Sequence, residues 1–174
     1  MSRNRTIIST AAAALLSATS LAACGGGGGN PATAASTPPK AADGKTATIG
    51  LADAGSLGKV LVDSSGRTLY LFQKDSGTTS ACSGPCAVAW PPLRASGKPA
   101  VGAGLSASKV GKSPRSDGKA QITYNGHPLY RFQGDKKAGD TNGQGISAFG
   151  GGWFALSSAG DMLSGSNPSG GGGY

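Results

Sequence analysis

The chain has 174 residues, including 31 Gly and 10 Pro, carries a formal net charge of +8 at pH 7, and contains Asp but no Glu. Because helices favour Glu, Leu and Ala whereas Gly and Pro interrupt them, this composition excludes a helix-rich protein and favours strands joined by turns. Only one apolar run approaches the length of a membrane helix, which excludes a multipass membrane protein. The basic residues are scattered singly, apart from Lys136-Lys137. Without a basic-aromatic cluster, we expect no nucleic-acid partner.

Residues 1–23 are predicted to be an export signal. Arg3 and Arg5 precede an uncharged run at 6–21, which ends in Leu-Ala-Ala-Cys24. This ending resembles a bacterial lipoprotein box, in which the cysteine thiol receives a diacylglyceryl group and the chain is cut before it. Acyl chains on Cys24 would anchor the protein stably to the cell membrane, on its extracytoplasmic face. The alternative is an ordinary secretory signal with an incidental cysteine.

Two segments around the predicted domain have the composition of flexible chain. Residues 24–45 contain runs of Gly, Ala and Pro and no large apolar side chain, so nothing offsets the entropy of ordering them. Residues 165–174 are similarly rich in Gly and are expected to be a disordered tail. The folded part is therefore predicted to span 46–164.

An internal repeat organises this domain. The segment Gly66-Arg-Thr-Leu-Tyr-Leu-Phe-Gln-Lys-Asp75 recurs as Gly126-His-Pro-Leu-Tyr-Arg-Phe-Gln-Gly-Asp135, identical at six of ten positions. Similarity continues before and after both segments. It defines two units of roughly 50 residues, repeat 1 at 46–97 and repeat 2 at 107–160.

Each repeat is predicted to be a β-hairpin followed by a loop and a further strand. The hairpins fall at 60–72 and 121–132, and Asn125-Gly126 in the second is a strong tight-turn signal. Strand alternation puts Tyr70 and Phe72 on one face and leucines on the other, which indicates a central strand. The remaining core is expected from five residues: Trp90, Leu93, Trp153, Phe154 and Leu156. One repeat could not bury these side chains alone, so we expect an all-β, pseudo-twofold β-sandwich or small barrel.

The repeated strands carry a motif that resembles a known family. The motif is Tyr-x-(Phe/Trp/Tyr)-x-x-Asp, represented here by Tyr70, Phe72 and Asp75 and again by Tyr130, Phe132 and Asp135. It resembles the secreted-repeat bacterial lipoproteins, and the resemblance extends to Cys-Ser-Gly-Pro-Cys-Ala-Val-Ala-Trp-Pro-Pro at 82–92 and to residues 117–118, 123–130 and 139–145. It implies an exported lipoprotein whose biochemical role is not established. Some members are loosely linked to hydrocarbon use, which nothing in these residues supports.

The pair Cys82 and Cys86, spaced C-x3-C, is expected to form a disulfide because the compartment outside the membrane is generally oxidising. Closing so short a loop would fix the loop more than the whole fold. Two alternatives stay open. One is a copper site of two thiolates and the imidazole of His127, the single histidine, and the other is a redox-exchanging thiol pair.

Other polar groups give weaker signals. The segment that begins at Asp140 starts like a calcium loop, but no Glu exists to supply the bidentate ligand, so a turn is expected. Asp75 and Asp135 are interpreted as caps of the loops that follow their strands, with paired carboxylates as the alternative. The two motif tyrosines are expected to bury their rings and bond their hydroxyls.

No catalytic residue or cofactor is predicted, because no nucleophile stands beside a recognisable base. The sequence favours a membrane-anchored, non-enzymatic binding or structural module of the cell envelope. Its expected partners are the membrane, through the lipid, and an envelope polymer or small ligand. The alternatives are a copper or thiol-redox module using the cysteine pair and, by family association, an accessory protein in hydrocarbon use.

Overall fold

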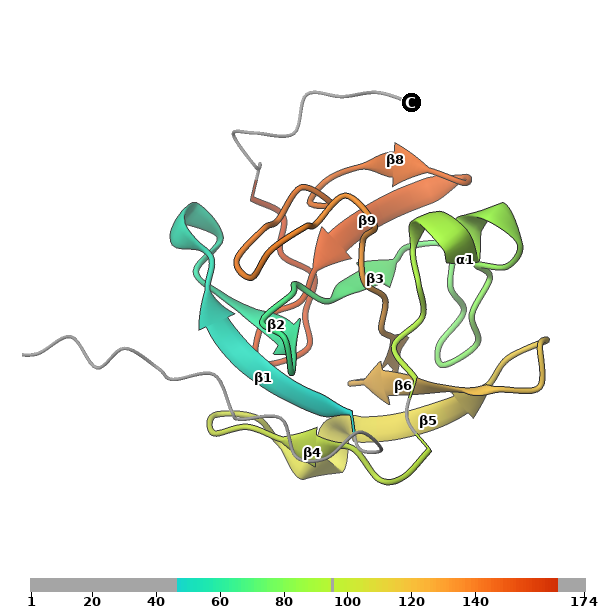
Figure 1. Cartoon of the computed structure of the whole chain (residues 1–174), viewed down its shortest axis with the longest axis horizontal. Coiled ribbons are helices and arrows are strands. Elements are labelled where there is room, and N and C mark those ends of the chain that lie inside the picture. The colour runs from blue at the N-terminus through green and yellow to red at the C-terminus, as the bar shows by residue number, and fades with distance from the viewer. Residues whose placement is uncertain (1–46, 95, 166–174) are drawn as a thin grey trace, which may run out of the picture. The chain divides into compact units, whose positions relative to one another are not determined.

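The computed structural model describes residues 47–94 and 96–165 (Figure 1). The predicted signal, Cys24, the tether and, beyond Gly165, the tail lie outside the described residues. Among the described residues, none of the helices has both the length and the apolar character needed to span a membrane.

The regular structure consists almost entirely of short strands. Repeat 1 contains β1 (Thr48–Asp53), the 3-10 helix η1 (Gly55–Leu57), β2 (Lys59–Asp63), β3 (Tyr70–Phe72) and the short helix α1 (Pro85–Ala89). Repeat 2 and the segment before it contain β4 (Ala100–Val101), the 3-10 helix η2 (Ala107–Lys109), β5 (Val110–Pro114), β6 (Ala120–Tyr124), β7 (His127–Pro128), β8 (Ser147–Ala148) and β9 (Gly151–Ala155).

Each repeat begins with an antiparallel strand pair. β1 pairs with β2 from Ile49 opposite Asp63, and β5 pairs with β6 from Val110 opposite Tyr124. The sequence did not predict β1 and β5 as strands of these pairs. The apolar residues of β1 and β5 are interrupted by Gly, Ala and Lys, so these two segments show little alternation. The turn at Asn125-Gly126 forms as predicted, with both residues at positive φ.

The strands form three small sheets, with the orders β2-β1-β4, β3-β9-β8 and β5-β6-β7. The all-β prediction is confirmed, but the sheets do not close into a barrel. Between sheets the ladder is reduced to isolated bridges, such as those of Tyr130 to Tyr70 and to Pro92. Pro91 and Pro92 have no N–H group to donate, so the segment after α1 cannot continue a ladder on both sides.

The two repeats exchange their last segments. β9 of repeat 2 pairs with β3 of repeat 1, and the Leu61 N–H donates to the Leu156 carbonyl at 2.9 Å. The counterpart bond in the other direction runs from the Ile122 N–H to the Leu93 carbonyl at 2.8 Å. The segment after α1 lies along repeat 2 through further backbone bonds, including Gln133 N–H to the Ala89 carbonyl at 2.9 Å. Each repeat is therefore completed by the other.

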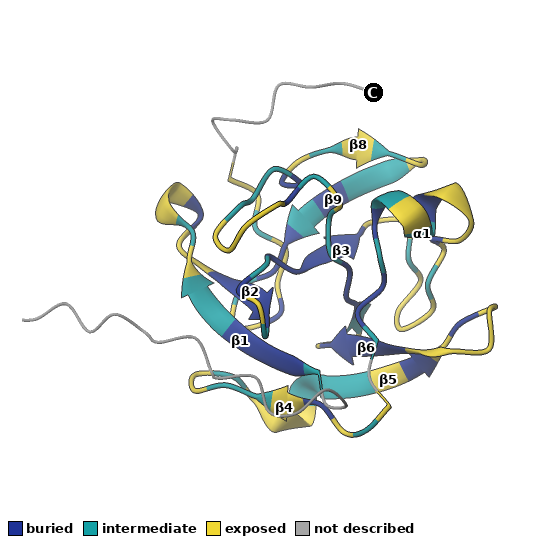
Figure 2. Cartoon of the chain, viewed as in Figure 1, coloured by how far each residue is buried: buried dark blue, intermediate teal, exposed yellow. Residues whose placement is uncertain are grey.

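The two motif segments, β3 and the stretch at 129–132, separate two apolar clusters, and β3 is buried along its whole length (Figure 2). The second motif copy was predicted to be a strand, but there only β7 (His127–Pro128) and an isolated bridge at Tyr130 form. On one side the core is centred on aromatic rings: Tyr70, Phe72, Trp90, Tyr130 and Trp153, together with the two cysteines and Leu57, Val60, Val62 and Ala155. On the other it is mainly aliphatic: Ile49, Leu61, Leu69, Leu71, Leu93, Ile122, Leu129 and Leu156, together with Tyr124. Of the five residues expected to complete the core, only Phe154 is half-buried instead of buried.

Candidate functional site

Four aromatic rings form a continuous stack across the junction of the repeats. Trp90 and Trp153 lie at its centre, with ring centroids 3.9 Å apart and planes inclined by 4°. Phe72 stacks on Trp153 at 4.0 Å, and Phe132 stacks on Trp90 at 4.3 Å. The rings therefore alternate between repeat 1 and repeat 2 along the stack. Separating the repeats would break every one of these contacts.

The two motif tyrosines meet this stack edge-on. Tyr70 contacts Trp90 at 5.4 Å and Tyr130 contacts Trp153 at 5.1 Å, both in T-shaped geometry. The backbones of the two tyrosines also bond each other reciprocally, at 2.8 and 2.9 Å. This reciprocal pair lies where the two motif segments cross. It is the centre of the pseudo-twofold arrangement.

The tyrosine hydroxyls cross between the repeats. Tyr70 donates to Asp135 at 2.7 Å, and Tyr130 donates to Asp75 at 2.9 Å. The other oxygen of each carboxylate accepts a backbone N–H from the loop after its own motif segment, that of Asn142 for Asp135 and that of Ala81 for Asp75. The loop-capping interpretation is confirmed, and each aspartate also binds the tyrosine of the opposite repeat.

Burial is the largest cause of the pKa shifts of these four side chains. It raises the pKa of both tyrosines, and the neighbouring aspartates raise it further. Burial also raises the pKa of Asp75, and that of Asp135 to about 6. Both hydroxyls therefore stay protonated and remain donors near neutral pH.

Cys82 and Cys86 form a disulfide, with Cα atoms 5.3 Å apart. Both residues are almost inaccessible, at 1% and 5% exposure. Thiol exchange needs access to a sulfur atom, so this burial argues against a redox-exchanging pair. A copper site with His127 would first require reduction of the bond. Within the described segments, no three His, Cys, Asp or Glu side chains form a group that could hold a metal ion.

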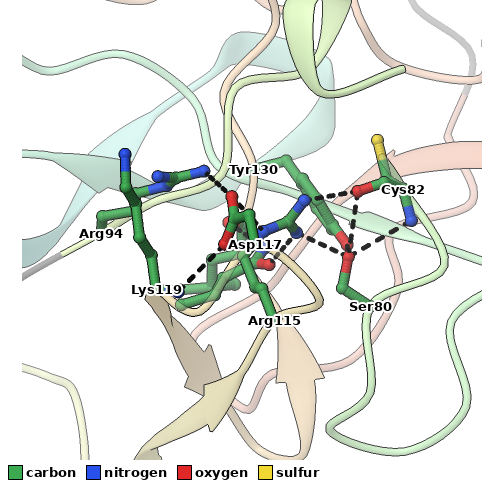
Figure 3. A network of polar contacts seen from close by, with 9 residues as sticks. Ser80, Cys82, Arg94, Arg115, Asp117, Lys119 and Tyr130 are labelled. Atoms are coloured by element: carbon green, nitrogen blue, oxygen red, sulfur yellow. Dashed lines mark hydrogen bonds and ion pairs between the residues drawn. The ribbon is translucent and has the colours of Figure 1, made fainter. Parts of the chain in front are cut away.

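A buried arginine fixes the disulfide loop to repeat 2 (Figure 3). Arg115 donates to the Cys82 carbonyl and, at 2.7 Å, to the Ser80 hydroxyl, while Gln121 accepts a third bond at 2.6 Å. Its Nε has no hydrogen-bond partner and lies 3.6 Å from a carboxylate oxygen of Asp117. Nothing in the repeat pattern indicated this arginine, because repeat 1 has no equivalent basic residue.

The loop at Asp140 is a turn, as expected. Its carboxylate accepts the backbone N–H groups of Lys136 and Lys137 at 2.9 and 3.0 Å. Both bonds go to the same carboxylate oxygen, Oδ2, and they hold the loop around Asp140.

A hollow of about 770 Å³ lies where the stack ends at Phe132. Its walls come from the end of α1, the segment after the second copy of the motif and the β8–β9 hairpin, which lie side by side (Figure 1). The apolar lining is Ala89, Trp90, Phe132, Ile146, Ala148 and Phe149. Gln133, Gly134 and Lys136 complete it. Lys136 is the single charged residue among the described residues of this lining.

The two ends of the stack differ. Phe72 is only 2% exposed and lies against Gly151 at the start of β9, whereas Phe132 is half-buried and opens on the hollow. At the hairpin tip, Phe149 is 45% exposed and has φ 58°, a left-handed conformation that bulky residues rarely adopt. Gly150 follows with φ 87°, so these two residues form the tight turn of the hairpin, as Asn125 and Gly126 do between β6 and β7.

Comparison with protein families matches residues 52–94 and 113–157 to a family described as a secreted repeat of unknown function. The two matched segments cover half of the chain. The chain belongs to this secreted-repeat family. Comparisons with curated proteins and with solved structures gave no match.

Membership of the secreted-repeat family places the domain outside the cytoplasm. Each matched segment runs from the opening strand pair through the motif to Leu93 or Leu156, so it includes the part that is exchanged with the other repeat. The motif residues of a secreted repeat therefore act here across the junction: tyrosine on the opposite aspartate, and phenylalanine on the opposite tryptophan. The hollow lies at one end of this junction. The sequence pattern did not indicate Phe149 or Lys136 as site residues, because both fall in loops that differ between the repeats.

Proposed function

We propose that this protein is a non-enzymatic binding module of the cell envelope, anchored to the membrane by lipid, and that the hollow beside Phe132 holds a small apolar ligand. The observation that carries the proposal is the asymmetry of the aromatic stack. One end, at Phe72, is buried, and the other opens into a hollow of about 770 Å³ with six apolar lining residues.

The dimensions and chemistry of the hollow support a small ligand. Its volume lies within the range of roughly 300–1,000 Å³ that is usual for such sites, and its lining combines apolar walls with few polar groups. The exposed Phe149 stands at its rim, in the tight turn of the β8–β9 hairpin. An apolar ligand would also agree with the loose link between such repeats and hydrocarbon use.

A neutral fluorescent probe tests the binding proposal. N-phenyl-1-naphthylamine should bind the purified domain with one saturable site and gain fluorescence. Ala148→Trp should abolish binding by filling the hollow, and Phe149→Ala should weaken it several-fold. Met162→Ala is the matched control, since Met162 is 42% exposed but lies outside the lining. Equal probe binding by the Ala148→Trp and parent proteins would refute the proposed site.

The lipid anchor rests on Arg3, Arg5 and the Leu-Ala-Ala-Cys24 ending. Cys24→Ser should release the protein from membranes, because without the thiol no acyl group is attached and the tether has no apolar surface. Membrane fractionation of cells that express each variant measures this, with Cys82→Ser as a control that keeps Cys24. A Cys24→Ser variant that loses its signal yet stays in the membrane pellet would contradict lipid anchoring.

A further inference from the structure

We propose that the ligand of this hollow is a fused aromatic ring system that carries a carboxylate or a similar anionic group. The inference rests on the proposed binding function and adds the chemical class of the ligand. Three features of the lining point to it: the open end of the ring stack, the single charged residue and the size of the space.

The open end of the stack favours a flat ring. Phe132, Trp90, Trp153 and Phe72 already stack with centroid separations of 3.9–4.3 Å. At the hollow this series ends on the half-buried Phe132, with Trp90 and Phe149 in the same lining. A planar ligand gains favourable offset-stacked or edge-to-face contacts with such rings, which a flexible aliphatic chain cannot make.

The charge of the lining favours an anion. Lys136 is exposed and lies outside the four ion pairs found among the described residues. The nearest carboxylates along the chain are otherwise engaged, since Asp135 binds Tyr70 and Asp140 accepts the backbone N–H of Lys136 itself. That bond fixes the backbone at Lys136, and Gln133 adds an amide to the same wall. The polar part of the lining can thus receive a carboxylate beside the aromatic walls.

The size of the space favours more than one ring. A volume of about 770 Å³ is larger than a single benzene ring needs and accommodates a two-ring system with a short polar substituent. Gly134 contributes to this fit, because a Cβ at that position would lie 2.3 Å from the Phe132 ring. The counterpart of Gly134 in repeat 1 is Lys74, whose side chain lies against Gly150 and Gly151 at the covered end of the stack.

Competition with N-phenyl-1-naphthylamine by three probes separates the contribution of the rings to binding from that of the charge. The three probes are 2-naphthoate, 2-naphthylmethanol, which keeps the rings without the charge, and decanoate, which keeps the charge without the rings. We expect 2-naphthoate to bind at least tenfold more tightly than either of the others. Lys136→Gln should lower 2-naphthoate affinity about fivefold or more and leave 2-naphthylmethanol unchanged. Lys137→Gln, at the adjacent position outside the lining, is the matched control.

The outcomes distinguish this inference from the function on which it rests. If decanoate binds as well as 2-naphthoate, or if Lys136→Gln changes nothing, the ligand class is wrong while the binding module stands. If N-phenyl-1-naphthylamine itself fails to bind the parent domain, the proposed function fails and the ligand class fails with it.

Discussion

At the scale of single residues, two buried carboxyl groups show opposite titration because their partners differ. Asp135 accepts a hydroxyl and a backbone N–H, both uncharged, so burial raises its pKa to about 6. Burial acts in the same direction on Asp63, but the guanidinium of Arg131 and the backbone N–H groups of Ser65 and Arg67 together outweigh it, and the pKa of Asp63 is lowered. Arg131 stands where repeat 1 has Leu71, so this ion pair exists on one side of the pseudo-twofold only.

The raised pKa of Asp135 predicts a pH-dependent stability. The folded protein holds the proton more tightly than the unfolded chain, so this contribution is complete below pH ~4, the unfolded pKa, and is lost as the pH rises through about 6. Between pH 4 and pH 7, the parent should lose about 2 kcal/mol more stability than Asp135→Asn, whose amide cannot ionise. Urea unfolding at four pH values measures the difference.

The lowered pKa of Asp63 changes stability with pH in the opposite direction. This contribution is present in both the parent and Asp135→Asn, so it cancels when the two proteins are compared. Asp53→Asn, at an exposed position, serves as the control and should reproduce the parent's pH profile. Parallel pH profiles for the parent and Asp135→Asn would show that this carboxyl does not titrate differently in the fold.

At the scale of elements, the exchange of terminal segments makes the repeats interdependent. β3 of repeat 1 pairs with β9 of repeat 2, and the segment after α1 in repeat 1 forms backbone hydrogen bonds with repeat 2. Each repeat also supplies one tryptophan to the shared stack. A repeat on its own would therefore expose an unpaired strand edge and several large aromatic rings.

Two fragments test this interdependence. Residues 47–98 and 99–165 are each expected to be unfolded in isolation and to assemble into a one-to-one complex when mixed. Circular dichroism and tryptophan fluorescence report folding, and sedimentation reports stoichiometry. Phe72→Ala in the first fragment should weaken assembly, because Phe72 stacks on Trp153 of the second. A first fragment that folds alone with a cooperative transition would contradict the exchange as the source of stability.

At the scale of the molecule, the disulfide loop joins the two repeats through Arg115 without controlling the whole fold. The loop that it closes is short, so the chain-entropy model assigns it about 2 kcal/mol. The stack, the crossed tyrosine bonds and the exchanged strands are contacts in which neither sulfur atom takes part. We therefore expect the two repeats to unfold in one transition with or without the bond.

The double variant Cys82→Ser/Cys86→Ser measures this. It should lower the free energy of unfolding by about 2 kcal/mol and keep coincident transitions by fluorescence and circular dichroism. The parent protein, reduced while unfolded in denaturant and refolded under reductant, should behave alike, which serves as an internal check on the serine side chains. Loss of all cooperative unfolding in the variant would mean that the bond supports the entire core.

The sequence by itself determined the all-β class, the two repeats and part of both core faces, while Ile49 and Tyr124 were not foreseen in the core and Phe154 is only half-buried. Those conclusions depend on local patterns: alternation in Leu69 to Phe72, the turn at Asn125-Gly126 and the recurrence of the motif. The disulfide followed from the spacing of Cys82 and Cys86 and the expected compartment. Each of these signals is contained in a short stretch of chain or, for the motif, in the likeness of two such stretches, so composition and order are enough to reveal them.

Only the tertiary structure decided how the repeats combine. A repeated motif does not say whether Tyr70 binds the aspartate of its own repeat or Asp135, because both arrangements have the same sequence. The open end of the stack was equally hidden, since Phe72 and Phe132 occupy equivalent motif positions and differ only in what covers them. Burial and partner choice at these sites depend on contacts between segments about 60 residues apart, which no local pattern encodes.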